Sequence, residues 1–103
     1  MTLYLDALHS PVIKSFKSKS LAELWAKSQI KGIDARMHSR ILRRLDVLNE
    51  AAKPDDMNVP GFNFHALREF DPTRYSVHVN GPWCITFAFA ATDAENIDFE
   101  QYH

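Results

Sequence analysis

The spacing of apolar residues changes once along this chain of 103 residues, and that change limits the folds open to it. Between residues 20 and 52 the apolar residues recur every three or four positions, which is typical of amphipathic helices. From residue 62 onward they alternate with polar residues, which is typical of half-buried strands. Helices followed by strands predict an α+β domain, with two N-terminal helices packed on a small, mainly antiparallel sheet.

Two helices are predicted in the N-terminal half. Residues 20–23 form a capping box, in which the Ser20 oxygen accepts an early helix N–H, and Gly32 is expected to end this helix. A second helix is predicted from a cap at Asp34 through about Ala52. Its apolar stripe consists of Met37, Ile41, Leu45, Leu48 and Ala52.

The C-terminal half is predicted to form a hairpin-rich sheet. Asn80-Gly81 lies between two alternating stretches and is a strong signal for a tight hairpin turn. A further turn is expected at residues 92–94. The predicted strands are residues 12–17, 62–67, 75–79, 83–89 and 97–101.

Composition narrows the class of protein. The length fits one domain over residues 1–103. The lone cysteine, Cys84, excludes an internal disulfide and any multi-cysteine metal site, and it is read as a small buried side chain. His9 and His38 have no metal-ligand spacing with the other histidines, so no metal is expected. With no long apolar run and no basic leader, we expect a cytoplasmic protein with no membrane partner.

Charge is distributed unevenly although the net charge is −1. Residues 1–53 hold ten Lys/Arg and five Asp/Glu, whereas residues 54–103 hold two Lys/Arg and eight Asp/Glu. The basic half could face RNA, or it could simply present a solvated helix face. The second predicted helix carries the densest basic set, which comprises Arg36, Arg40, Arg43 and Arg44.

Several short motifs occur in a characteristic order. They are Ile13-Lys14-Ser15-Phe16-Lys17, Phe64-His65-Ala66-Leu67-Arg68, Tyr75-Ser76-Val77, Asn80-Gly81-Pro82-Trp83 and the closing Gln101-Tyr102-His103. Together they resemble the HigB-type toxins, a branch of the RelE-like (RelE/ParE) toxins of bacterial toxin–antitoxin pairs. The resemblance runs from about Val12 to His103 and implies the RelE-like, microbial ribonuclease-type fold. Residues 1–11 look like an N-terminal extension, either an added strand or a different translation start.

The resemblance implies a ribosome-dependent mRNA endonuclease. In such toxins the ribose 2′-OH attacks the adjacent phosphate, which needs a base, a cation and an acid but neither a metal nor another cofactor. The resemblance also implies a helix-turn-helix antitoxin of the HigA type as partner. Operator DNA would then be reached only indirectly, through that antitoxin.

Four residues match the site of such toxins. His65 can act as a general acid or a general base, and Arg68 can bind phosphate oxygens. Tyr102 can stack on a base or bind a phosphate, and His103 can exchange a proton. Two positions depart from the pattern: Gln101 stands where an aspartate is frequent, and Cys84 where an arginine commonly follows the tryptophan.

These departures leave three functions open. Losing one transition-state donor typically costs on the order of 100- to 1000-fold in rate. Cys84 therefore indicates an attenuated toxin, a toxin in which Arg68, Arg74 or a ribosomal group compensates, or a Cys-bearing subgroup with its own arrangement of charges. The main alternative is a silent homologue that acts as an antitoxin-binding or co-repressor module. A ribosome-independent ribonuclease is a third possibility, which the acidic C-terminal half disfavours. His78 has no named partner and is interpreted as structural.

Overall fold

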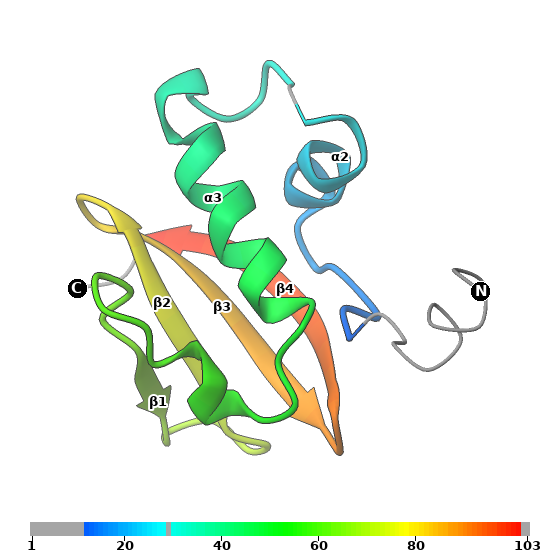
Figure 1. Ribbon diagram of the computed structural model, residues 1–103, viewed down its shortest axis with the longest axis vertical. Coiled ribbons are helices and arrows are strands. Elements are labelled where there is room, and N and C mark those ends of the chain that lie inside the picture. Colours follow the sequence, from blue (N-terminus) through cyan, green and yellow to red (C-terminus); the bar gives the residue numbers. More distant parts are fainter. Residues whose placement is uncertain (1–11, 29, 102–103) are drawn as a thin grey trace, which may run out of the picture.

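In the computed structural model, which describes residues 12–28 and 30–101, α-helices from the N-terminal half lie on one face of a four-stranded antiparallel sheet (Figure 1). The strands follow one another across the sheet in the order β1-β2-β3-β4. This arrangement confirms the predicted α+β class. The elements are α2 (Lys19–Lys27), α3 (Ala35–Leu48), the 3-10 helix η1 (Pro54–Met57), β1 (His65–Leu67), β2 (Arg74–Asn80), β3 (Trp83–Ala90) and β4 (Asp93–Gln101).

Helix α2 begins and ends earlier than its sequence pattern indicates. Its cap is Ser18, whose Oγ accepts the Leu21 N–H at 3.0 Å, so the predicted capping box at Ser20 is wrong. The Ser18 N–H is itself bonded to the Ile97 carbonyl, which fixes the chain in an extended state up to that residue. The helix ends at Ser28 in a left-handed conformation (φ 68°), four residues before the predicted stop at Gly32.

Helix α3 has the predicted cap, Asp34, whose carboxylate accepts the Arg36 N–H at 2.9 Å. The Arg36 guanidinium also binds this carboxylate and, together with that backbone bond, lowers the pKa of Asp34 to about 2. The helix ends at Leu48 instead of Ala52. The next residue, Asn49, turns its side chain toward residues 12 and 13 and accepts both of their N–H groups at 3.2 Å.

Residues 12–17 lie parallel to β4 along the edge of the sheet. The predicted strand here is an extended segment with two isolated bridges, Ile13 to Ala94 and Phe16 to Ile97. β1 is also shorter than the predicted 62–67, because Asn63 adopts a positive φ of 48° and interrupts the extended chain. Among the described residues, no helix is long and apolar enough to cross a membrane.

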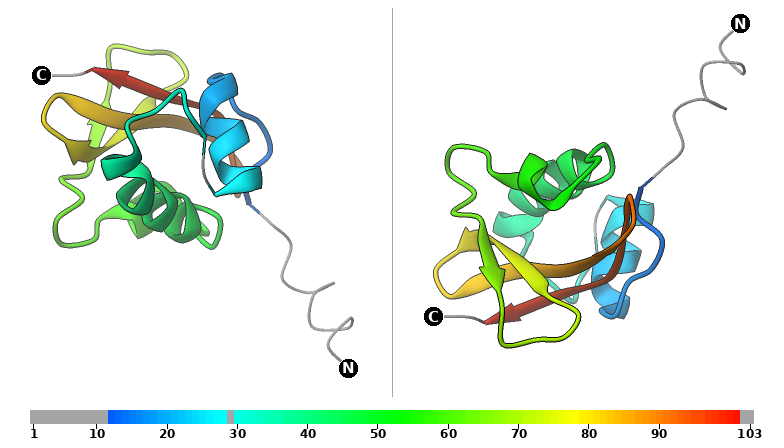
Figure 2. Two further views of the ribbon diagram at one scale, coloured as in Figure 1. Left: turned by 90° about the horizontal axis from the view of Figure 1, so that it is seen from above. Right: turned by 90° about the horizontal axis from the view of Figure 1, so that it is seen from below.

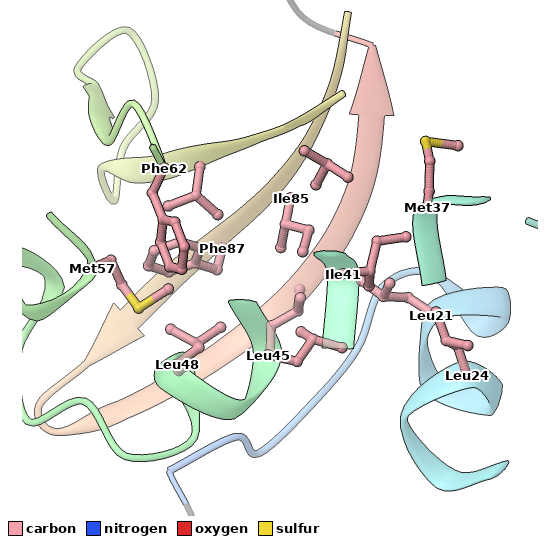
Figure 3. Close-up of a cluster of buried hydrophobic side chains, with 14 of the residues drawn as sticks. Leu21, Leu24, Met37, Ile41, Leu45, Leu48, Met57, Phe62, Ile85 and Phe87 are labelled. Atoms are coloured by element: carbon pink, nitrogen blue, oxygen red, sulfur yellow. The ribbon is translucent and has the colours of Figure 1, made fainter. Parts of the chain in front are cut away.

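The core lies between the helices and the sheet face that they cover (Figure 3). Apolar residues alternate along β2 and β3 and meet the stripe of α3. The predicted stripe is confirmed except at its last residue: Ala51 is buried and Ala52 is exposed. The central buried residues are Met37, Ile41, Leu45, Leu48, Met57, Phe62, Val77, Val79, Ile85 and Phe87.

One member of the basic set belongs to this core. Arg44 is buried, and its guanidinium donates to the carbonyls of His78 (2.6 Å), Arg40 (3.0 Å) and Gly61 (3.4 Å) while lying 4.4 Å from the centre of the Phe62 ring. Burial and the neighbouring arginines lower its pKa. Arg44 is therefore neither part of a solvated face nor available to a partner, in contrast to the exposed Arg36, Arg40 and Arg43.

Candidate active site

The second face of the sheet carries no helix in the described part of the chain, as the two views of Figure 2 show. Residues that pair directly across antiparallel strands project to the same face. One row on this face therefore runs His65, Ser76, Thr86 and Asp98, from β1 to β4. The neighbouring row runs His78, Cys84 and Glu100.

A hollow of about 580 Å³ lies on this open face, at the end near the β2–β3 hairpin. It is formed by β1, the turns that flank it, β2, the hairpin and the start of β3. The described residues that line it are Asn63, His65, Ala66, Leu67, Glu69, Ser76, His78, Gly81 and Cys84.

His65, the first predicted site residue, lines this hollow. It opens β1, pairs with Ser76 of β2 and is exposed. No hydrogen bond holds its ring within the described part of the chain, so both ring nitrogens are available to a ligand. An exposed imidazole on a strand of a paired sheet can exchange a proton with a bound substrate.

The other three predicted residues lie elsewhere. Arg68 is exposed in the turn after β1 and is not among the described residues that line the hollow. Tyr102 and His103 lie outside the described residues. The described chain reaches Gln101, which pairs with Trp83 at the end of β3.

His78, which the sequence predicts to be structural, also lines the hollow. Its Nε2 lies 2.9 Å from the Gly81 carbonyl, and its own carbonyl accepts the Arg44 Nε. These contacts hold the hairpin, as a structural residue would. The ring nevertheless lines the same hollow as His65. The sequence signal for this position is the alternation along β2, which places His78 on the same face of the sheet as Ser76.

Cys84 is buried, as the sequence predicts, and it points to the open face between His78 and Glu100. Burial, and to a smaller extent the Glu100 carboxylate, raise the pKa of the thiol. The side chain therefore stays protonated near neutral pH, which argues against a thiolate nucleophile. It also supplies no positive charge to the hollow.

Arg74 covers a different part of the open face. Its Nη2 donates to Thr86 Oγ1 at 3.1 Å and to the Asn96 carbonyl at 2.8 Å. The Thr86 hydroxyl in turn donates to the Glu100 carboxylate. Since these bonds hold the guanidinium over Thr86, Arg74 does not replace a cation at position 84. Among residues 12–28 and 30–101, no group of three or more His, Cys, Asp or Glu is placed to hold a metal ion.

Comparison with known proteins identifies the family of the chain. Residues 14–103 match the family described as RelE-like toxin of type II toxin-antitoxin system HigB. The chain is also 34% identical over 92 residues to the Endoribonuclease HigB of Proteus vulgaris, an alignment that covers 89% of this chain and 100% of that protein. The suggested extension at residues 1–11 lies outside the described residues and stays a prediction. The match over most of the chain confirms the resemblance: the protein belongs to the family of HigB, RelE-like toxins of type II toxin–antitoxin systems.

Proposed function

We propose that this toxin is an endoribonuclease that cuts mRNA on the ribosome, with His65 in its active site. The observation that carries the proposal is the position of His65 in a hollow on the open face of the sheet. The name of the Proteus vulgaris relative, an endoribonuclease, supports the reaction class. A hollow of about 580 Å³ is within the range of small-molecule pockets and has room for part of a nucleotide.

The proposed reaction is attack of a ribose 2′-OH on the adjacent phosphate, with departure of the 5′-oxygen. His65 exchanges a proton with the reacting oxygens, and Arg68 binds phosphate from the turn beside β1. Tyr102 and His103 complete the proposed site, an assignment that rests on the family resemblance alone. Because the nucleophile belongs to the substrate, the reaction needs no metal or cofactor.

Ribosome dependence is supported by the charge of the open face. Glu69 lines the hollow, and Asp98 and Glu100 project from β4 to the same face. Carboxylates repel the phosphates of free RNA, which is usually captured by a basic cleft. An mRNA that the ribosome already holds does not require such capture. We therefore propose the translated mRNA in the cytoplasm as the substrate.

The proposed partner is a helix-turn-helix antitoxin of the HigA type, which would block the toxin and link it indirectly to operator DNA. Arg36, Arg40 and Arg43 are exposed on α3 and are available to an antitoxin or to the ribosome. Of these, Arg40 also donates to the Val79 carbonyl at 3.1 Å, so its guanidinium is partly committed to the fold.

A second candidate function is favoured by Cys84. The buried, protonated thiol leaves the hollow without the cation that resemblance to the family leads us to expect there. A phosphorane without that charge balance forms slowly. The chain would then act mainly as an antitoxin ligand and co-repressor.

Mapping of mRNA 5′ ends after brief induction distinguishes the endoribonuclease from the catalytically silent co-repressor. The intact toxin is expected to produce new ends inside translated codons, and His65→Ala is expected to lose them. Lys53→Ala, an exposed change outside the open face, serves as the control and should cut normally. No new ends from the folded, expressed intact toxin, with antitoxin binding preserved, would refute the nuclease and support the co-repressor.

A further inference from the structure

Two histidines from neighbouring strands line one hollow. His65 of β1 pairs directly with Ser76 of β2, and His78 lies two residues farther along β2 on the same face. Such diagonal neighbours have backbones about 7–8 Å apart, which lets two imidazoles approach one phosphodiester from different sides. The strands that carry them lie side by side in Figure 1.

The hydrogen bond of His78 selects one tautomer of its ring. The Gly81 carbonyl can only accept, so Nε2, at 2.9 Å, must carry a proton and donate it. In the neutral ring the lone pair then resides on Nδ1, which has no hydrogen-bond partner among the described residues. A nitrogen with this lone pair is the form that a general base requires.

The strand beneath this ring is firmly held. The His78 N–H donates to the Phe62 carbonyl at 2.6 Å, and the His78 carbonyl accepts the Arg44 Nε at 2.6 Å. Arg44 is buried in the core and stacks on the Phe62 ring. A core residue thus fixes the backbone of a residue whose side chain faces the hollow, which limits how far the ring can move.

We propose that His78 is the general base of the cleavage reaction and that His65 is its acid, an inference that rests on the proposed function. Nδ1 of His78 takes the proton of the 2′-OH as the O2′–P bond forms. The His65 imidazolium gives a proton to the 5′-oxygen as the P–O5′ bond breaks. The products are a 2′,3′-cyclic phosphate and a free 5′-OH, and the two rings regain their starting states by exchange with water.

The division of roles predicts a bell-shaped pH profile. A base acts when deprotonated, so the rate rises with pH through its titration, whereas an acid acts when protonated, so the rate falls through its own. Titratable and charged groups lie on every element that neighbours His78. They are His65 on β1, Glu69 in the following turn, Arg74 on β2, Cys84 on β3, Glu100 on β4 and Arg44 on α3.

The test measures single-turnover cleavage of mRNA on programmed ribosomes by the full chain across pH. His78→Gln keeps an amide N–H that can reach the Gly81 carbonyl but removes the base. We expect a loss of about 100-fold or more and disappearance of the acidic limb, because a general base typically contributes 10²–10⁴-fold. His65→Ala should lose the alkaline limb instead.

Two further measurements separate a base from a support for the hairpin. His78→Ala with added imidazole should regain part of the rate, since free imidazole restores a base but not the bond to Gly81. Thr92→Ala, exposed in the turn at the other end of the sheet, should behave as the intact toxin.

Near-normal cleavage by His78→Gln, with His65→Ala inactive, would overturn the role of His78 and leave the proposed nuclease standing. If the pH profile of His78→Gln retained its acidic limb, the role of His78 as general base would likewise be overturned. No cleavage by the intact toxin at any pH would instead refute the proposed function itself.

Discussion

The two faces of the sheet are formed by the same strands but differ in their side chains and in what covers them. On the covered face, Val77, Ile85 and Phe87 are at most 1% exposed and pack against the helices. On the open face, Ser76 and Thr86 are also buried, and Thr86 hydrogen-bonds to the polar side chains of Arg74 and Glu100. The alternation of a strand therefore places the apolar core on one side and the proposed active site on the other.

Long side chains, and not a layer of helices, cover part of the open face. Arg74 and Glu100 reach across β3 and hydrogen-bond to Thr86, which is fully buried beneath them. Nearer the hairpin, no residue of 12–28 or 30–101 forms such a cover, and the hollow with His65 and His78 opens there. Substitutions on the covered face should change stability, and those in the hollow should change activity.

The largest expected effect on stability comes from opening a cavity on the covered face. Leu45 is fully buried on α3, so Leu45→Ala should lower the free energy of unfolding by about 2–5 kcal/mol. Urea denaturation measures this, with Leu42→Ala as the matched control, since Leu42 is only partly buried. Equal losses in the two variants would contradict the division between core and edge of the helix.

Removing the buried guanidinium should have the next largest effect. Arg44→Met keeps an apolar chain near Phe62 but removes the guanidinium that donates to the carbonyls of His78, Arg40 and Gly61. We expect a loss of about 1–3 kcal/mol, the usual cost of an unsatisfied buried polar group. The exposed Arg43→Met should cost less than about 1 kcal/mol. A thermal denaturation series of the two variants tests this, and indistinguishable curves would show that Arg44 is dispensable.

The cap of α2 allows a sharper test within one short segment. Ser18→Ala removes the oxygen that binds the Leu21 N–H and should cost about 1 kcal/mol. Ser20→Ala, two residues later, should cost much less, because Ser20 lies inside the helix. Chemical denaturation of both variants gives the answer, and a larger effect at Ser20 would restore the capping box that the sequence predicts.

The smallest effect on stability is expected at Cys84, where reactivity is the better measure. Burial and Glu100 raise the thiol pKa above its ordinary value of 9.0, so the reactive thiolate appears only as pH rises through the raised pKa. A disulfide reagent at pH 8 should therefore react much more slowly with the folded toxin than with the unfolded chain. Glu100→Gln should speed the reaction, and an unchanged rate would leave burial as the only cause.

The periodic features of the sequence were enough to predict the class of fold. The stripe from Met37 to Leu48, the Asp34 cap and the Asn80-Gly81 hairpin are all confirmed. Boundaries that depend on long-range contacts were predicted wrongly. Ser18 caps α2 because Ile97, far along the chain, fixes the residue before the helix, and no local pattern contains that bond.

The site was predictable only in part for a similar reason. His65 follows from a motif, and the structure places it in the hollow. Arg44 looked like one more surface arginine, since nothing in a helical pattern indicates that its guanidinium meets carbonyls of residues 61 and 78. His78 required the register of three strands before it could be placed beside His65 and Cys84.

The backbone pairing of residues 12–17 with β4 has a consequence for the order in which the protein folds. Ser15 Oγ accepts the N–H of Asn96, a pair separated by 81 residues. At a synthesis rate of about 5–20 residues per second, residue 15 leaves the ribosome seconds before its partner exists. The helices and the β2–β3 hairpin can form from nearby residues, whereas the contact of residues 12–17 with β4 must wait until a long loop has been brought together. The start of α2 stays unanchored until then, so the toxin reaches its final form only after Asn96 and Ile97 have been synthesised.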